Sequence, residues 1–260
     1  ALKRAFPGEA FGDGDLRPLY EAAYFVNPKV REDHLKTARR FLEHVNPYTK
    51  TAVKDEPQWV FFNILNEDPL SSWALRGETA PRLMASYWNA HLKEKYGDTE
   101  GLRRAWGRLN GGEILEKGSV AMPKTLEESP RGEDLVRYFA ALHREGWAAM
   151  KELMRSVGSR ALLTDINMAH DRSILLARDG FEFVDQHAYH DHPQFPQNEW
   201  GLPYGFNQKT ALRRTGWTGI HIPSYLALSR HAGKPYVVTE YDHCFPNGSR
   251  MEAGLVFGAQ

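Results

Sequence analysis

Three stretches of the chain carry apolar residues at the three- and four-residue steps of an amphipathic helix. The first is KVREDHLKTARRFLEHV, residues 29–45, which the Asn46-Pro47 step ends. The second covers residues 82–106 with an interruption at Gly97-Asp98, and the third covers residues 133–157. The sequence predicts helices over these ranges. The opening segment to Asn27 is rich in Gly, Asp and Pro and is typical of a loop.

Four short apolar runs have the length of buried strands. They are QWVFFNIL at residues 58–65, ALLTDI at 161–166, the run from Phe181 to Val184 that continues into DQHAYH, and PYVVT at 235–239. Helical patterns at residues 173–178 and 224–232 separate the later runs. Strands that alternate with helices predict an α/β fold with parallel strands and crossover helices.

Each apolar run ends in side chains able to do chemistry, namely Asn66, Glu67, Asp165, Asn167, His187, Tyr189 and Glu240. Catalytic groups at the carboxyl ends of strands are typical of a (β/α)8 TIM barrel, whereas the GxGxxG turn of a dinucleotide-binding sheet is missing from the sequence. A barrel needs eight strands and the pattern supplies four. We therefore predict that residues 1–260 form one incomplete (β/α)8 catalytic domain with strands about four to seven, and that residues 70–160 form a helical insert over the active-site face.

Composition narrows the range of partners. The chain has 260 residues, of which 42% are hydrophobic and 25% charged, and its 33 basic and 33 acidic residues cancel. This neutrality gives no reason to expect nucleic acid or an anionic membrane as partner. The single Cys244 excludes an internal disulfide and a cysteine-rich metal site. The compartment and the oligomeric state stay open. Because the chain begins with alanine, a removed leader would fit a secreted or periplasmic location.

Two strand-end carboxylates suggest a reaction. Glycosidic bond cleavage needs two carboxyl groups on either side of the bond, and Glu67 and Glu240 follow apolar runs at the same predicted edge. Asn66 is placed to bind a sugar hydroxyl. His187 and Tyr189 are two residues apart on an extended segment, so both side chains are expected to face one side and reach Glu240.

This order of motifs resembles a known group of enzymes. Asn66-Glu67 after a fourth strand, His187-Ala-Tyr189 after a sixth and Glu240 after a seventh resemble clan A of retaining glycoside hydrolases, which contains family 5 cellulases and mannanases and family 42 β-galactosidases. The stretch WNAHLKEKYGDTEGLRRAWG looks like a helical insert of the galactosidase-like branches. The resemblance implies a carbohydrate substrate, no cofactor, Glu67 as acid/base and Glu240 as nucleophile, with Asn66, His187 and Tyr189 as contacts to the substrate or nucleophile.

Two other classes of function remain open. The first is a metal-dependent barrel hydrolase built on the group Asp185, His187, His190, Asp191, His192, Asp242 and His243, although the sequence contains no HExxH. The second is a carbohydrate-binding barrel without turnover. Flat aromatic side chains suit sugar rings in either a binding protein or an enzyme, and the candidates for stacking are Trp73, Trp200 and Trp217.

Overall fold

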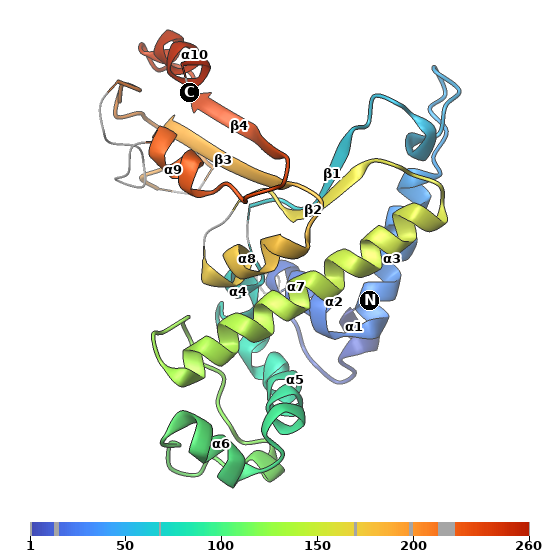
Figure 1. Ribbon diagram of the computed structural model, residues 1–260, viewed down its shortest axis with the longest axis vertical. Helices are drawn as coiled ribbons and strands as arrows, with labels where there is room; N and C mark the ends of the chain where they lie inside the picture. Colours follow the sequence, from blue (N-terminus) through green and yellow to red (C-terminus); the bar gives the residue numbers. More distant parts are fainter. Residues whose placement is uncertain are drawn as a thin grey trace. The chain divides into compact units, whose positions relative to one another are not determined.

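The computed structural model describes residues 2–12, 16–67, 69–168, 171–197, 200–212 and 222–259. These residues form two compact units, and each is described by itself. The first unit comprises residues 1–166 and 170–181, and the second comprises residues 167–169 and 182–260. The helices and strands are coloured along the chain in Figure 1.

The first unit holds two strands, eight helices and three 3-10 turns within its described residues. The strands are β1 (Phe61–Leu65) and β2 (Leu162–Ile166). The helices are α1 (Leu2–Ala5), α2 (Leu16–Val26), α3 (Pro28–Leu42), α4 (Leu70–Ala74), α5 (Thr79–Tyr96), α6 (Thr99–Trp106), α7 (Pro130–Ser156) and α8 (Arg172–Ala177). The 3-10 turns are η1 (Val53–Asp55), η2 (Leu115–Lys117) and η3 (Arg178–Gly180), of which the last follows α8.

The two strands of the first unit pair in parallel, with Phe61 opposite Leu162 and Leu65 opposite Ile166. Helices α4 to α7 lie between them in sequence, so this unit is one long crossover with a helical insertion. The sequence pattern predicted both strands and the long helix. Gly97, with a φ of 79°, ends α5, and Asp98 caps α6 by accepting a hydrogen bond from the N–H of Gly101 at 2.7 Å.

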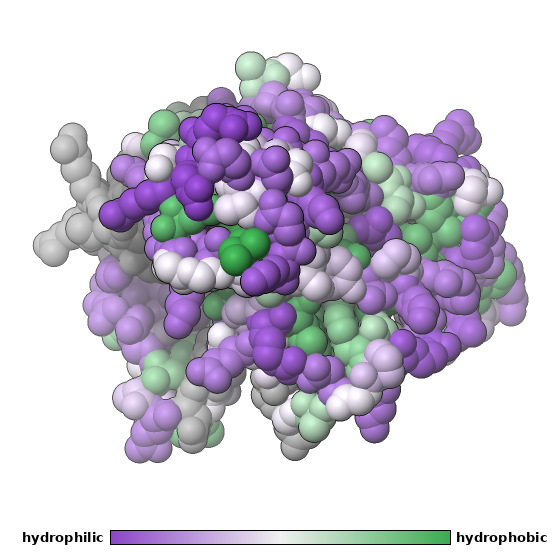
Figure 2. Space-filling model, turned by 90° about the horizontal axis from the view of Figure 1, so that it is seen from below, coloured by the Kyte–Doolittle hydropathy of each residue, from purple (hydrophilic) through white to green (hydrophobic). Residues whose placement is uncertain are grey.

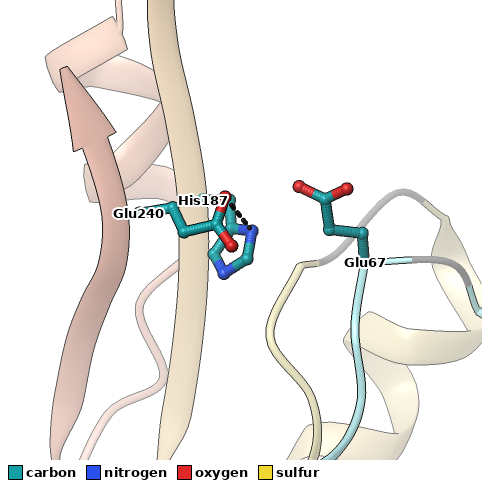
Figure 3. Close-up of side chains that lie close together, drawn as sticks. All are labelled: Glu67, His187 and Glu240. Atoms are coloured by element: carbon teal, nitrogen blue, oxygen red, sulfur yellow. Dashed lines mark ion pairs between the residues drawn. The ribbon is translucent and has the colours of Figure 1, made fainter. Parts of the chain in front are cut away.

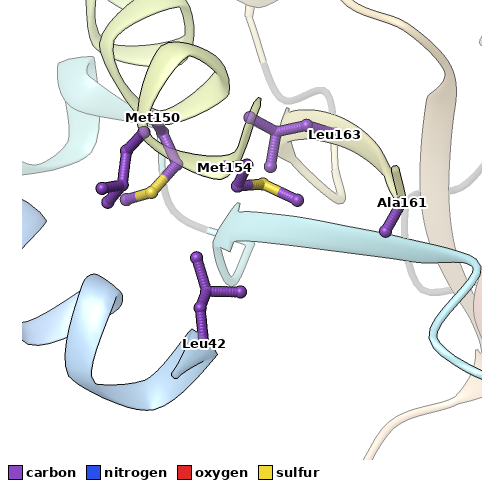
Figure 4. Close-up of a cluster of buried hydrophobic side chains, with 6 residues drawn as sticks. Leu42, Met150, Met154, Ala161 and Leu163 are labelled. Carbon is purple, nitrogen blue, oxygen red and sulfur yellow. The ribbon is translucent and has the colours of Figure 1, made fainter. Parts of the chain in front are cut away.

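The core beside the β1–β2 pair comes from α3, α7 and β2. Figure 4 shows its buried apolar side chains, which are Leu42, Met150, Leu153, Met154, Ala161 and Leu163. Trp147 of α7 packs against this cluster, and its indole N–H donates to the carbonyl of Leu163 at 2.9 Å. The apolar stripe of α7 therefore fixes the helix to the strand that follows it.

The opening segment corrects one prediction. Residues up to Asn27 were expected to be loop, but α2 covers Leu16–Val26 and is one of the best-buried helices of the first unit. Leu19, Tyr24 and Phe25 are each 1% exposed or less. The Gly, Asp and Pro residues that suggested a loop fall almost entirely before this helix, while its second half is a run of alanine and aromatic residues.

The second unit holds β3 (Val184–Asp191), β4 (Tyr236–His243), α9 (Ile222–Leu228) and α10 (Arg250–Gly258). The strands pair in parallel, and α9 packs on β3 through the apolar group Ala188, Ile222 and Leu226. Both strands run further than the apolar pattern predicted, so that His187, Tyr189 and Glu240 lie within strands instead of after them. The two described sheets are thus parallel pairs of an α/β fold, and no closed barrel is formed by the described residues.

The surface agrees with the balanced composition. In Figure 2 hydrophilic side chains cover most of the face shown, and hydrophobic side chains appear between them in small groups. No described helix combines the length and hydropathy that a bilayer crossing requires.

Candidate functional site

The candidate site is built around Glu240, in the middle of β4. Its side chain is 39% exposed, and it accepts a hydrogen bond at Oε2 from the hydroxyl of Tyr189 at 2.6 Å. His187 Nδ1 lies 3.4 Å from the same oxygen. Both partners come from β3, at positions two residues apart, so the alternation of an extended strand brings them to one carboxylate as the sequence predicted.

An irregularity in the strand pairing sets this geometry. Gln186 pairs with Val238 and His187 pairs with Glu240, which leaves Thr239 as an extra residue in β4. Bulges of this kind re-aim side chains and are common beside active sites. Here the bulge brings Thr239 Oγ1 to 3.0 Å from His187 Nε2 and puts Glu240 opposite His187.

A buried carboxylate orients this part of the site. Asp185 is fully buried, and its Oδ2 accepts from the hydroxyl of Thr239 at 2.6 Å while its Oδ1 accepts from the backbone N–H of Gln186 at 2.7 Å. Because the one hydroxyl hydrogen of Thr239 points to Asp185, Thr239 Oγ1 must accept from His187 Nε2–H. The relay from Asp185 through Thr239 thus fixes the ring of His187 beside Glu240. A proton on Nδ1 as well would make an imidazolium–carboxylate pair with Glu240.

Glu67 belongs to the first unit and lies just beyond β1. It is partly buried, its neighbour Asn66 is exposed, and its backbone φ is 58°. This left-handed conformation is uncommon for a residue with a Cβ and marks a position that the surrounding structure holds under strain. Figure 3 shows Glu67 beyond the end of β1, and shows His187 and Glu240 on adjacent strands joined by their ion pair.

The three tryptophans predicted to stack on sugars have different positions. Trp73 is 4% exposed in α4 and packs in the first unit, so its ring presents little free face. Trp217 lies outside the described residues. Trp200 is 71% exposed, and it is part of an aromatic loop cluster made of His192, Phe195, Trp200 and Tyr204.

The aromatic loop cluster connects to the carboxylate site. Paired hydrogen bonds between Gln194 and Gly205, at 2.8 and 3.0 Å, close the loop that carries the cluster. The ring of His192 is 6.2 Å from that of Tyr189, the residue that binds Glu240. Aromatic faces therefore continue from Glu240 outwards to the exposed ring of Trp200.

The histidines do not assemble as a metal site within the second unit. Three of the four histidines have hydrogen-bond partners in the protein: His187 bonds Thr239, His190 bonds the hydroxyl of Tyr241 at 2.8 Å, and His192 bonds a backbone carbonyl. The fourth, His243, is buried and stacks on the ring of His190 at 4.8 Å between centroids, and its ring nitrogens have no hydrogen-bond partner among the described residues. Among the described residues of this unit alone, no three imidazole or carboxylate groups converge closely enough to hold a cation.

Comparison with known proteins gives a likeness of fold. No protein-family model matches the sequence, and no curated protein matches it significantly. An exo-β-agarase of known structure aligns with a TM-score of 0.54 at 15% identity, over 88% of this chain and 30% of its own. The structure of PfGH50B aligns with a TM-score of 0.51 at 14% identity, over 84% of this chain and 29% of its own. The chain thus has the fold of a segment of these enzymes and spans less than a third of their length.

The fold neighbours differ in name from the families that the motif order resembles: one is an exo-β-agarase, and neither is described as a cellulase or β-galactosidase. The relation to families 5 and 42 stays a prediction. Sequence reasoning did not find Thr239, whose place in the bulge orients His187, or the buried His143 of α7, which accepts from the backbone N–H of Leu70. His143 has one signal in the sequence: it is a polar residue on the apolar stripe of α7, one turn after Phe139.

Proposed function

We propose that this chain carries the catalytic carboxylates of a retaining β-glycoside hydrolase, with Glu240 as nucleophile and Glu67 as acid/base. The observation that carries the proposal is the environment of Glu240, whose Oε2 accepts a hydrogen bond from the Tyr189 hydroxyl at 2.6 Å and lies 3.4 Å from His187 Nδ1. Such contacts orient the carboxylate, and a nucleophile must be held in a fixed orientation towards the reacting carbon. The chain spans less than a third of its fold neighbours, so the activity is proposed for the protein in its natural length.

The first chemical step forms a glycosyl-enzyme. With Oε2 bound to the hydroxyl of Tyr189, the other oxygen of Glu240, Oε1, attacks the anomeric carbon. The bond from this carbon to the leaving oxygen breaks, and Glu67 gives its proton to that oxygen. Asn66, beside Glu67 and exposed, binds the hydroxyl next to the reacting carbon.

The second step releases the sugar with its original configuration. Glu67, now ionised, takes a proton from a water molecule, and the hydroxide equivalent attacks the same carbon while the ester bond to Glu240 breaks. Both carboxyls return to their starting states, so the cycle needs no cofactor. The mechanism requires the two carboxyls to approach to about 5 Å, and about 9 Å would instead fit an inverting enzyme.

The fold supports this placement of the two residues. Parallel pairs β1–β2 and β3–β4, each joined by a helical crossover, have the connectivity of consecutive strands of a (β/α)8 barrel. In such a barrel the carboxyl ends of all strands meet at the catalytic face, which would bring the end of β1 to the side where β4 carries Glu240.

The substrate we propose is a β-linked polysaccharide, with agarose as the first candidate. The support is the fold shared with an exo-β-agarase together with the neutral charge of the chain. The aromatic loop cluster adds rings for stacking beyond the reacting sugar. Helices α4 to α7, inserted after β1, would close one side of the cleft and favour cleavage at a chain end.

The test is the substitution Glu240→Gln, which keeps the size of the side chain and removes its charge. Release of reducing ends from agarose and of phenol from aryl β-glycosides should fall to background, because no glycosyl ester forms. Glu94→Gln makes the same chemical change at an exposed position of α5 and should leave the rate unchanged. An unchanged rate in Glu240→Gln removes the assignment. Binding of agarose without any turnover in the unsubstituted enzyme would favour the non-catalytic alternative.

A further inference from the structure

A buried histidine–aspartate pair lies in the first unit, between α7 and β2. His143 Nδ1 is bonded to Asp165 Oδ2, and both side chains are 0% exposed. On the other side of the ring, His143 Nε2 accepts the backbone N–H of Leu70 at 3.1 Å. The pair therefore links the long helix and the second strand to the first residue of α4.

These contacts fix the tautomer of His143. Since Nε2 accepts a hydrogen bond from Leu70, it carries a lone pair, and the single ring proton must be on Nδ1. Asp165 accepts that proton's hydrogen bond, as a carboxylate does when it orients a functional imidazole. Without the carboxylate of Asp165, both neutral tautomers of His143 would be populated. In the Nε2–H form, the N–H of the ring would face the backbone N–H of Leu70, and no hydrogen bond could form between them.

The surrounding helices hold the ring in place. The ring of Phe25, from α2, lies with its centroid 4.7 Å from that of His143. One turn further along α7, Gly146 lets α2 approach so closely that a Cβ there would meet the rings of Tyr24 and Phe25 at 3.0 Å. The hydroxyl of Tyr24 donates to the carbonyl of Gly146 at 2.8 Å. His143 is thus a rigid acceptor.

Leu70 lies three residues after Glu67, whose backbone has a φ of 58°. A residue with a Cβ keeps such a conformation only where the surrounding structure over-determines it. The strand β1 holds the chain on one side of Glu67, and the hydrogen bond from Leu70 to His143 holds it on the other.

We propose that His143 and Asp165 are positioning residues for Glu67: Asp165 sets the tautomer of His143, and His143 anchors the turn that presents the acid/base carboxyl. This inference rests on the proposed function. It predicts that the pair affects proton donation by Glu67 more than it affects attack by Glu240. If the pair only satisfied the buried N–H of Leu70, substituting it would lower the stability of the protein. It would not change which of the two chemical steps is slow.

Two substitutions of His143 separate its two hydrogen bonds. The terminal amide of glutamine reaches the place of Nε2, so His143→Gln keeps an acceptor for Leu70. The amide of asparagine reaches the place of Nδ1, so His143→Asn keeps the bond to Asp165 and loses the acceptor. Met150→Ala, in the core on the same helix, is the control for lost packing.

The first measurement is the rate of amide hydrogen exchange at Leu70, which NMR monitors in the protein of residues 1–260. Exchange at Leu70 should be at least about tenfold faster in His143→Asn than in His143→Gln, because only the former frees this N–H. Met150→Ala should show no selective change at Leu70. In Asp165→Asn, the NMR signals of the ring nitrogens of His143 should show that the Nε2–H tautomer is more populated.

The second measurement is the dependence of kcat/KM on the leaving group of aryl β-glycosides. Glycosides with a poor leaving group need a proton from Glu67, whereas dinitrophenyl glycosides do not. His143→Asn should lose about 10²-fold on the poor leaving group, the cost of misplacing a catalytic group by about 1 Å, and much less on the good one. His143→Gln and Met150→Ala should keep the unsubstituted profile.

The outcomes separate the two proposals. Normal exchange at Leu70 and a normal leaving-group profile in His143→Asn would overturn the inference. A normal leaving-group profile in Glu67→Ala would instead overturn the acid/base role of Glu67, and the exchange at Leu70 would still decide whether His143 anchors the turn.

Discussion

The hydroxyl of Tyr189 donates to Glu240 Oε2 at 2.6 Å, across the paired strands β3 and β4. This contact joins two residues far apart in sequence and selects one oxygen of the carboxylate. The residues on either side of Tyr189 in β3, Ala188 and His190, are buried. The contact with Glu240 gives the polar hydroxyl of Tyr189 a partner in this buried part of the strand. The spacing of His187 and Tyr189 predicted that both would reach Glu240, and both contacts are confirmed.

Removing this hydroxyl should slow the reaction without unfolding the protein. A hydrogen bond to a charged group contributes about 1.5–3 kcal/mol, so Tyr189→Phe is expected to lower kcat by roughly 10- to 10²-fold. The measurement is turnover of a dinitrophenyl β-glycoside, for which attack by Glu240 needs no proton from Glu67. Tyr48→Phe, at a side chain that is 91% exposed, is the matched control. An equal kcat in the two variants would show that Glu240 does not depend on Tyr189.

Trp200→Ala should weaken the binding of long substrates only. The exposed ring packs against Phe195 at 5.2 Å between centroids, with the two ring planes tilted by 47°, and offers its remaining surface to a sugar. Loss of one aromatic contact of about 1 kcal/mol is expected to raise KM for agarose oligosaccharides by about fivefold and leave KM for aryl monoglycosides unchanged. Trp59→Ala, at the 46% exposed tryptophan of the first unit, serves as control. A similar rise for the monoglycosides would place Trp200 at the reacting sugar instead.

The helical insert should lose stability in acid through Asp134. Burial alone would raise the pKa of Asp134, but hydrogen bonds from Lys95 at 2.6 Å, Tyr96 at 2.5 Å and Trp106 at 2.7 Å outweigh it and hold the pKa below 3.8. A carboxyl with a lowered pKa stabilises the fold above its unfolded pKa, and this contribution is lost as the pH falls through the folded value.

Asp134→Asn is therefore expected to reduce the free energy of unfolding by about 2 kcal/mol at neutral pH. The difference from the unsubstituted chain should shrink as the pH falls below the usual range of an aspartate. Urea unfolding at several pH values measures this, with Glu94→Gln as a surface control on α5. A difference that stays constant down to about pH 2 would contradict the lowered pKa of Asp134.

Periodicity predicted the parts of the fold where burial alone decides the structure. Helix α7 and strands β1 and β2 follow their apolar patterns closely, because each buries one face against its neighbours in the same unit. The break at Gly97 was predicted for the same local reason, since a glycine with positive φ ends α5.

The ends of β3 and β4 were beyond such reasoning. Their polar residues stay in the strands because they satisfy one another, as Asp185 does with Thr239 and Tyr189 with Glu240. A pattern of hydrophobic positions carries no information on such pairs. The bulge at Thr239 and the link from His143 to Leu70 also depend on contacts between distant segments. The candidate residues were visible in the sequence, but the groups that orient them were not.

The central claim, that Glu240 is the nucleophile of a retaining enzyme, is tested most directly by trapping the glycosyl-enzyme. A 2-deoxy-2-fluoro glycoside with a dinitrophenyl leaving group slows the second step and lets the ester accumulate. Mass spectrometry of the digested protein should then find the fluoro-sugar on the peptide that contains Glu240, and Glu240→Gln should remain unlabelled. A label on another carboxylate, or turnover of agarose with inverted configuration, would contradict the account.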